Sequence, residues 1–186
     1  MKKPLLIILL GPVSVGKTTI GEKVSKELNL PFINKDSLKE VIFDTNGWRD
    51  KEYSREIGNT AYSILYHFTN CLLGNSSAVI VEANFLPKYA NNKLNNLIKK
   101  YNAHAIQLNC WAQEGVLIKR FKERNKLGYR HPGHCEDFIF NDIKDSLNRG
   151  RVESLDIEGE VLNIETTDLN KINYTDLINH ISSRIY

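Results

Sequence analysis

Residues 5–19 read LLIILLGPVSVGKTT, a strongly apolar run followed at once by a glycine-bearing turn. The six apolar residues at its start predict a strand buried on both faces. Gly11, four further residues and then Gly16-Lys17-Thr18 give the spacing of a loop that wraps phosphate groups. The glycines let main-chain N–H groups turn inward, Lys17 supplies a cation, and the Thr18 hydroxyl can bind Mg²⁺.

A helix is predicted directly after this turn, from Thr18 to Leu28, because Ile20, Val24 and Leu28 share one helical face. Its positive N-terminal end would face an anion held by the loop. The alternative is a glycine turn that matches the spacing by accident, and the strand before it and the helix after it argue against that. We therefore expect a nucleotide and Mg²⁺ to bind here, the nucleotide being held by Gly11, Pro12, Val13, Ser14, Val15, Gly16, Lys17, Thr18 and Thr19.

Length and composition predict one domain covering residues 1–186, with 41% hydrophobic and 25% charged residues. The net charge of +3 suits an anionic substrate, but the chain has no dense basic run of the kind that binds nucleic acid. Three cysteines without paired spacing predict reduced thiols in a cytoplasmic protein. The apolar stretches are too short to cross a bilayer, so no membrane association is expected, and the sequence does not indicate an oligomeric state.

Short apolar segments alternate with helical patterns along the rest of the chain. Residues 30–34, 78–81, 103–110 and 161–164 predict four further strands. The alternation predicts an α/β three-layer sandwich with a five-stranded parallel sheet. The clearest helix runs from Ser54 to Leu73 and ends before Gly74, with a core-facing stripe of Ile57, Ala61, Ile64, Leu65, Phe68 and Leu72 and with Tyr62, Tyr66 and His67 on its other face.

Two carboxylates follow predicted strands and would meet the phosphate loop at one edge of the sheet. Asp36 comes after the second strand and is our candidate for the general base that accepts the proton of a hydroxyl acceptor. Its alternative task is to cap the helix that starts there. Glu82 ends the third strand and is, with Thr18, a candidate for the metal site, the alternative being a solvent-facing carboxylate.

A basic segment in the second half of the chain has the composition of a lid. The predicted helix at 113–124 places Arg120 and Arg124 at the edge of its apolar face, and residues 125–134, with Arg130, are too irregular for a helix or a strand. These arginines would neutralise charge on a transferring phosphoryl group and Arg124 would also contact the nucleotide, the alternative being a solvated charge run. Thr167, after the fifth strand, lies where an adenine base often sits in such sheets.

The chain resembles the small phosphate-loop kinases over nearly its whole length. The resemblance rests on the loop at 11–18, Asp36, Glu82-Ala83-Asn84, Arg120, Arg124 and the Arg-His-Pro-Gly-His segment at 130–134. Within these kinases it is similar to the group that holds chloramphenicol phosphotransferase, the zeta toxins and polynucleotide 5′-kinase, proteins often labelled only as AAA-family ATP-binding proteins.

The resemblance implies a P-loop nucleoside triphosphate hydrolase fold of the nucleotide-kinase kind and phosphoryl transfer from ATP to a hydroxyl. It also implies that Asp36 deprotonates the acceptor, that Lys17 holds the phosphates and that the lid arginines close on ATP. Two features depart from the pattern. Glu82 stands where several relatives carry aspartate, and residues 44–53 match no relative, which leaves the acceptor open.

Three functions remain to be compared. A kinase for a small-molecule hydroxyl acceptor is favoured. A polynucleotide 5′-hydroxyl kinase is weaker, because no stretch interleaves aromatic and basic residues. The third is a non-catalytic ATP or GTP switch, or a simple ATPase. Asp44-Thr45-Asn46-Gly47 fits the γ-phosphate-sensing pattern of such switches, but it follows a predicted helix rather than a strand.

Overall fold

The computed structural model describes residues 3–75 and 78–185, apart from the side chain of residue 137. Its sheet contains five parallel strands in the order β2-β3-β1-β4-β5. Their bounds are β1 Leu5–Leu10, β2 Phe32–Asn34, β3 Ala78–Glu82, β4 His104–Trp111 and β5 Glu160–Glu165. The predicted parallel sheet is confirmed, and β1 is its central strand.

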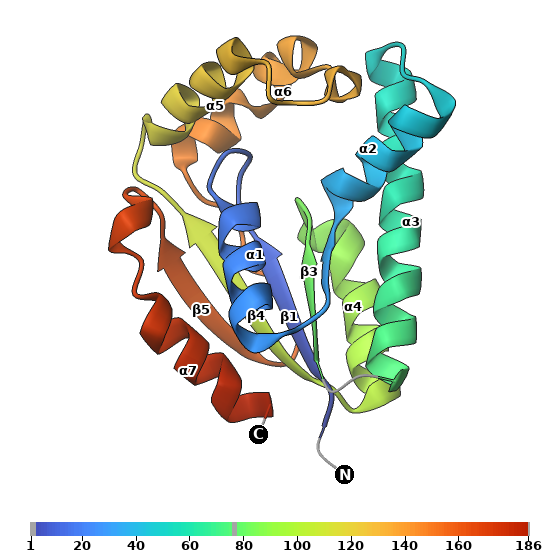
Figure 1. Cartoon of the computed structure of the whole chain (residues 1–186), viewed down its shortest axis with the longest axis vertical. Helices are drawn as coiled ribbons and strands as arrows, with labels where there is room; N and C mark the ends of the chain where they lie inside the picture. Colours follow the sequence, from blue (N-terminus) through green and yellow to red (C-terminus); the bar gives the residue numbers. More distant parts are fainter. Residues whose placement is uncertain (1–2, 76–77, 186) are drawn as a thin grey trace.

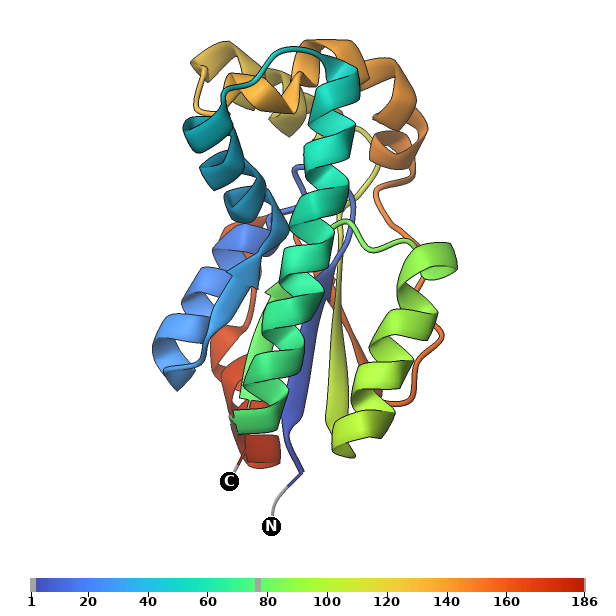
Figure 2. The same ribbon diagram turned by 90° about the vertical axis from the view of Figure 1, so that its right-hand side faces the viewer.

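Helices cover both faces of the sheet and also its upper edge (Figure 1). Viewed from the side, α3 and α4 lie in front of the sheet, α1 lies to its left and α7 lies behind it (Figure 2). α5 and α6 lie across the carboxyl ends of the strands. The bounds are α1 Lys17–Leu28, α2 Lys35–Asn46, α3 Lys51–Asn75, α4 Pro87–Tyr101, α5 Val116–Leu127, α6 Glu136–Arg149 and α7 Tyr174–Ile185.

The two cores are built from alternate residues of β1. Leu5, Ile7 and Leu9 pack with residues of α1 and α7, whereas Leu6 and Ile8 pack with residues of α3 and α4. All six residues of this strand are fully buried. The continuous apolar run is therefore explained by a strand covered on both faces, as the sequence predicts.

The longest helix differs from its prediction at both ends and on its buried face. α3 begins three residues earlier than expected and continues through Gly74, whose ideal Cβ would make only ordinary contact with Tyr101. Phe68 is about half exposed, so placing it in the core was wrong. The buried positions lie almost strictly four residues apart, a narrower stripe than the apolar pattern indicates: Ile57, Ala61, Leu65, Thr69 and Leu73.

Two connections are shorter than the sequence suggests. Residues 44–50 are rich in turn-forming residues and predict a loop, but α2 extends to Asn46, so the connection to α3 consists of residues 47–50. The lid segment at 125–134 is also more ordered than expected, because α5 continues to Leu127 and a 3₁₀ turn covers Pro132–His134. Within the described ranges, no helix is long and apolar enough to cross a membrane.

Leu65→Ala should lower the free energy of unfolding by about 2–5 kcal/mol, because it removes a fully buried side chain between α3 and the sheet. Phe68→Ala is the matched control on the same helix and should cost less than about 1 kcal/mol. Urea denaturation of both variants measures the difference. Equal losses would show that Phe68, and not Leu65 alone, packs in the core.

Candidate active site

The loop at residues 11–16 has a backbone that tolerates few side chains. Gly11 and Gly16 both have positive φ angles, 148° and 98°. A Cβ on Gly11 would lie 2.5 Å from the carbonyl oxygen of Cys110, and one on Gly16 would lie 2.8 Å from the Leu169 side chain. Ser14 also has a positive φ of 63°, and its buried hydroxyl has no hydrogen-bond partner among the described residues. A phosphate oxygen would satisfy that hydroxyl.

Lys17 is buried at the base of this loop. Its ammonium donates to the carbonyl oxygens of Gly11 at 2.9 Å and Pro12 at 2.8 Å, and to Oδ1 of Asn84 at 3.0 Å. Burial lowers the pKa of Lys17, and the nearby charge of Glu82 opposes that shift. All three partners of the ammonium are uncharged, so the anionic oxygens of a phosphate would bind it more strongly.

Thr18 and Glu82 meet as predicted, and Asn34 joins them. The Thr18 hydroxyl donates to Oε1 of Glu82 at 3.1 Å, and the Asn34 amide donates to both Oε2 of Glu82 and the Thr18 hydroxyl. Burial raises the pKa of Glu82, while the charge of Lys17 works in the opposite direction.

The chemistry of these two oxygen ligands fits Mg²⁺. Mg²⁺ prefers oxygen ligands and retains water, so one hydroxyl and one carboxylate suffice when phosphate oxygens complete the shell. Across the described residues no three His, Cys, Asp or Glu side chains converge in a way that could hold a metal ion by themselves. Thr18 and Glu82 would therefore hold the ion together with a nucleotide rather than alone.

Asp36 lies in the first turn of α2, and its backbone position is set by Asn34. The Asn34 side chain caps α2 by accepting hydrogen bonds from the N–H groups of Asp36 at 2.7 Å and Ser37 at 3.0 Å. The expectation that Asp36 itself caps the helix was wrong, because the helix begins at Lys35 and Asn34 is its N-cap, so Asp36 lies two residues after the capping position. The Asp36 carboxylate is therefore available for other contacts.

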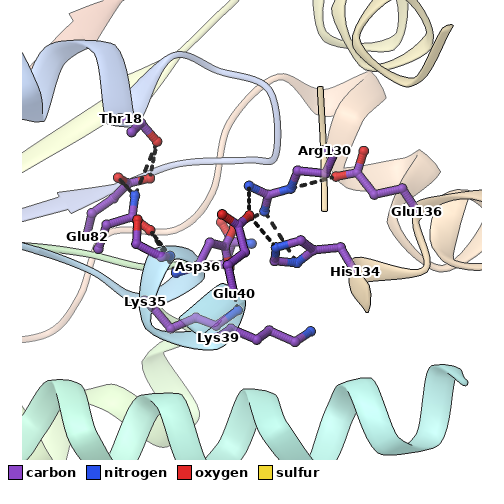
Figure 3. Close-up of polar contacts among 12 residues, drawn as sticks. Thr18, Lys35, Asp36, Lys39, Glu40, Glu82, Arg130, His134 and Glu136 are labelled. Atoms are coloured by element: carbon purple, nitrogen blue, oxygen red, sulfur yellow. Dashed lines mark hydrogen bonds and ion pairs between the residues drawn. The ribbon is translucent and has the colours of Figure 1, made fainter. Parts of the chain in front are cut away.

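Two cations hold the Asp36 carboxylate. The ammonium of Lys35 lies 2.6 Å from Oδ1, and the guanidinium of Arg130 donates to Oδ2 (Figure 3). Burial alone would raise the pKa of Asp36, but the charges of Lys35 and Arg130 outweigh it and hold the pKa well below its usual range. Asp36 is thus ionised at neutral pH.

Arg124 and Arg130 face the cavity and form ion pairs with acidic residues. Arg124 pairs with Oε1 of Glu136, and the Nε of Arg130 lies 3.4 Å from the same oxygen. Arg130 also contacts Glu40 at 3.3 Å, and Nε2 of His134 lies 2.7 Å from Glu40. The competing prediction of a solvated charge run is therefore wrong for these two arginines.

His134 belongs to the same cluster but is uncharged at neutral pH. Burial and the neighbouring charge of Arg130 lower its pKa to about 3. Sequence analysis did not single out Glu40 or Glu136. One signal was present for Glu40, which is four residues from Asp36 and therefore on the same helical face.

Arg120 differs from the other two arginines. Its guanidinium donates to the carbonyl oxygens of Thr166 at 2.7 Å and Thr167 at 3.1 Å, so it binds the segment that follows β5. The Thr167 hydroxyl accepts a hydrogen bond from the N–H of Gln113 at 3.0 Å and donates one to Glu165. Arg120 lines the cavity but is anchored to main chain rather than to the carboxylates around Arg130.

A cavity of about 1280 Å³ is lined by the phosphate loop, Asp36, Glu82 and the arginines at 120, 124 and 130, but not by Glu40 or Thr167. It extends from the phosphate loop past Asp36 to a wall formed by α3 and by the residues after β3, where Tyr62 and Tyr66 line it and His67 does not. The two tyrosine rings lie 6.4 Å apart and are nearly parallel. Sites for single ligands usually measure 300–1,000 Å³, so this cavity has room for a nucleotide and a second small molecule.

Residues 6–148 match the model of the AAA domain family AAA_33. The chain belongs to this family. It is also similar to the crystal structure of a "putative kinase" from Chloroflexus aurantiacus j-10-fl, with a TM-score of 0.92, 34% identity and coverage of 98% of this chain and 99% of that one. The predicted likeness to small P-loop kinases is confirmed at the level of the family.

Curated relatives match over a shorter region. The shikimate kinase of Pseudomonas fluorescens is 46% identical over 59 residues, which is 25% of this chain and 33% of that protein. The shikimate kinase of Francisella tularensis subsp. novicida is 31% identical over 84 residues, 47% of its length. The chain thus spans between a third and a half of these relatives. A gluconokinase structure from Sinorhizobium meliloti 1021 shares the fold alone, at 16% identity and a TM-score of 0.53 over the whole of this chain and 93% of that one.

Asn34→Ala should lower the free energy of unfolding by more than about 1 kcal/mol, because α2 loses the oxygen that caps its first turn and the amide contacts with Glu82 and Thr18 are lost as well. Asn34→Ser loses the same amide contacts but keeps a capping oxygen, so it should be about 1 kcal/mol more stable than Asn34→Ala. Urea denaturation at neutral pH compares the two variants. Equal losses would mean that the contacts with Glu82 and Thr18, and not the cap, are what Asn34 contributes to stability.

Proposed function

We propose that this protein is a kinase that transfers the γ-phosphoryl group of Mg-ATP to a hydroxyl group of a small molecule. One observation carries the proposal: Asp36 lies in the same cavity as the phosphate loop, the Thr18 and Glu82 pair and the inward-facing arginines. A switch or a simple ATPase needs the loop and the metal ligands. It has no use for a carboxylate that faces the part of the cavity between the phosphate loop and α3. The family and its kinase relatives support the same activity.

Each group has a defined task in this reaction. The N–H groups of the loop and Lys17 bind the phosphates, and Thr18 and Glu82 would hold Mg²⁺, which would neutralise charge on the phosphate oxygens. Arg124 and Arg130 stabilise the charge that spreads over the transferring group. Arg120 lines the nucleotide end of the cavity and binds the main chain of Thr167, whereas Thr167 itself is not among the residues that line the cavity.

Asp36 accepts the proton of the acceptor hydroxyl as the hydroxyl oxygen bonds to the γ-phosphorus, while the bond from that phosphorus to the β-phosphate oxygen breaks and ADP leaves. A carboxylate with a strongly lowered pKa is a weak base, which limits its use while Lys35 and Arg130 hold it. If Arg130 turns from Asp36 to the phosphoryl group, the pKa of Asp36 rises and the carboxylate becomes a better base. The same movement would supply charge to the transition state and a base to the acceptor.

The structure also bears on the switch alternative. Asp44, the first residue of the possible γ-phosphate-sensing pattern, lies in the last turn of α2 and not at the end of a core strand. Its carboxylate lies 3.2 Å from Nε2 of His131. It does not line the cavity that contains the phosphate loop. These contacts favour the kinase over the switch.

Asp36→Asn should reduce phosphoryl transfer by at least about 100-fold while Mg-ATP still raises the melting temperature, because asparagine cannot accept the proton. Lys17→Ala is the matched comparison and should lose both transfer and the Mg-ATP-dependent shift. Transfer is measured with γ-labelled ATP and a panel of hydroxyl compounds. Normal transfer by Asp36→Asn would contradict the role of Asp36, and a wild-type protein without any Mg-ATP-dependent shift would contradict the proposed function.

A further inference from the structure

One part of the cavity is rich in cations that the phosphates do not need. It lies between α2 and the first two turns of α3, and we call it the cationic lobe; it is lined by Lys39, Lys51, Ser54, Arg55 and Gly58. Lys51 and Arg55 both pair with Asp142 of α6, at 2.7 Å and 3.2 Å. Lys39 has no such partner.

Lys39 is a buried cation without a carboxylate. Its side chain is only 7% exposed, and no carboxylate oxygen of the described residues lies within 4.0 Å of its ammonium. The ammonium donates one hydrogen bond, to the Ser54 hydroxyl at 2.7 Å. Burial lowers the pKa of Lys39 to about 8, with a further contribution from Lys35. Keeping an unpaired ammonium in such a place costs free energy unless an anion compensates it.

The hydrogen bond to Ser54 does not explain why a buried ammonium is present at position 39. The Ser54 hydroxyl itself donates to the carbonyl oxygen of Gly133 at 2.6 Å, and that bond alone already links α3 to the lid segment. An ammonium has three donors, and one of them is used here. The ammonium also lies 5.2 Å from the centroid of the Phe43 ring, a weaker cation–π contact that supplies no hydrogen-bond acceptor, so two donors remain for an anion in the cavity.

Gly58 lines the same cavity as Lys39 and Ser54. It lies one turn after Ser54 in α3, where a glycine costs about 1 kcal/mol relative to alanine. An ideal Cβ on Gly58 would have no atom within 4 Å, so no neighbouring backbone or side chain requires a glycine there. The residue widens the cationic lobe instead of allowing a close approach of two elements.

Lys39 and Asp36 can contact one small molecule. They are three residues apart on α2 and therefore lie on the same face, about 5–6 Å apart at Cβ. In Figure 3 both side chains extend from this helix on the side of the lid. We propose that the acceptor is an anionic alcohol, whose carboxylate or phosphate group binds Lys39 while its hydroxyl faces Asp36. This inference rests on the proposed kinase function.

Matched pairs of acceptors test the charge requirement directly. The pairs are D-glycerate and glycerol, D-gluconate and D-glucose, and D-ribose 5-phosphate and D-ribose, each tested with γ-labelled ATP and Mg²⁺. In at least one pair we expect the anionic member to have a KM at least about 10-fold lower than its neutral counterpart. The first two pairs report on carboxylates and the third on phosphates. Neutral members that match or exceed their anionic counterparts in every pair would overturn the proposal.

Variants of Lys39 assign the effect to this residue. Lys39→Met should raise the KM of the preferred anionic acceptor by about 10- to 100-fold and leave the melting-temperature shift with Mg-ATP unchanged. Lys39→Arg keeps the charge and should restore most of the affinity. Lys23→Met makes the same substitution on α1, at a residue outside the cavity, and should have no effect. An unchanged KM in Lys39→Met would overturn the assignment.

The pH dependence supplies a second readout. The wild-type KM for the anionic acceptor should rise above pH 8, as Lys39 loses its proton, whereas the KM of Lys39→Arg should stay flat to pH 9. The groups that face this ammonium are Lys35 and Asp36 from α2, Ser54 from α3, and Arg130, His134 and Cys135 from the lid side. A wild-type profile that is flat to pH 9 would contradict the role of Lys39.

Calorimetry separates this proposal from the proposed function. The same pairs are titrated into the protein with Mg²⁺ and a non-hydrolysable ATP analogue. If anionic members bind more tightly but ATP transfers no phosphoryl group, the kinase function fails and the anion site stands. If a neutral member is phosphorylated as well as its anionic counterpart in every pair, the kinase stands and the anion site fails.

Discussion

The contact between Arg130 and Asp36 is the interaction on which the arrangement of the site depends. It joins the lid segment to α2, two parts of the chain that are 94 residues apart. Arg130 is also shared with Glu40 and Glu136, and Glu136 holds Arg124, so a single guanidinium links both lid arginines to the candidate base. The network is partly buried, so removing one member leaves charges without partners in a poorly solvated place and should destabilise the fold, by less than in a fully buried pair.

The same network connects stability to the proposed chemistry. An arginine that is paired with carboxylates of the chain can turn to a substrate only if the substrate offers an equivalent anion. A triphosphate offers such oxygens to Arg130, and an anionic acceptor would offer one to Lys39. On this account, each ligand supplies an anion to a cation that otherwise shares its carboxylate partners, as Arg130 does, or has none, as with Lys39. Ligand binding is thereby coupled to the closure of the lid.

Much of the fold and part of the site could be predicted from sequence. The phosphate loop, the parallel sheet and the meeting of Thr18 with Glu82 follow from local spacing and from strand ends that share one edge. The buried face of α3 was not predicted correctly at Phe68, because an apolar pattern does not show how narrow the contact with the sheet is. Glu40, Glu136 and Lys39 were missed, because their importance arises from tertiary packing of α2, α3 and α6 and not from any local pattern.

A crystal structure with Mg²⁺ and a non-hydrolysable ATP analogue tests the central claim most directly. The account predicts phosphate oxygens on the N–H groups of residues 13–18, the metal ion between Thr18 and Glu82, and the guanidinium of Arg130 turned from Asp36 to the γ-phosphate. A triphosphate bound outside the loop, or an Asp36 carboxylate still held by Arg130 and turned away from the γ-phosphate, would contradict it.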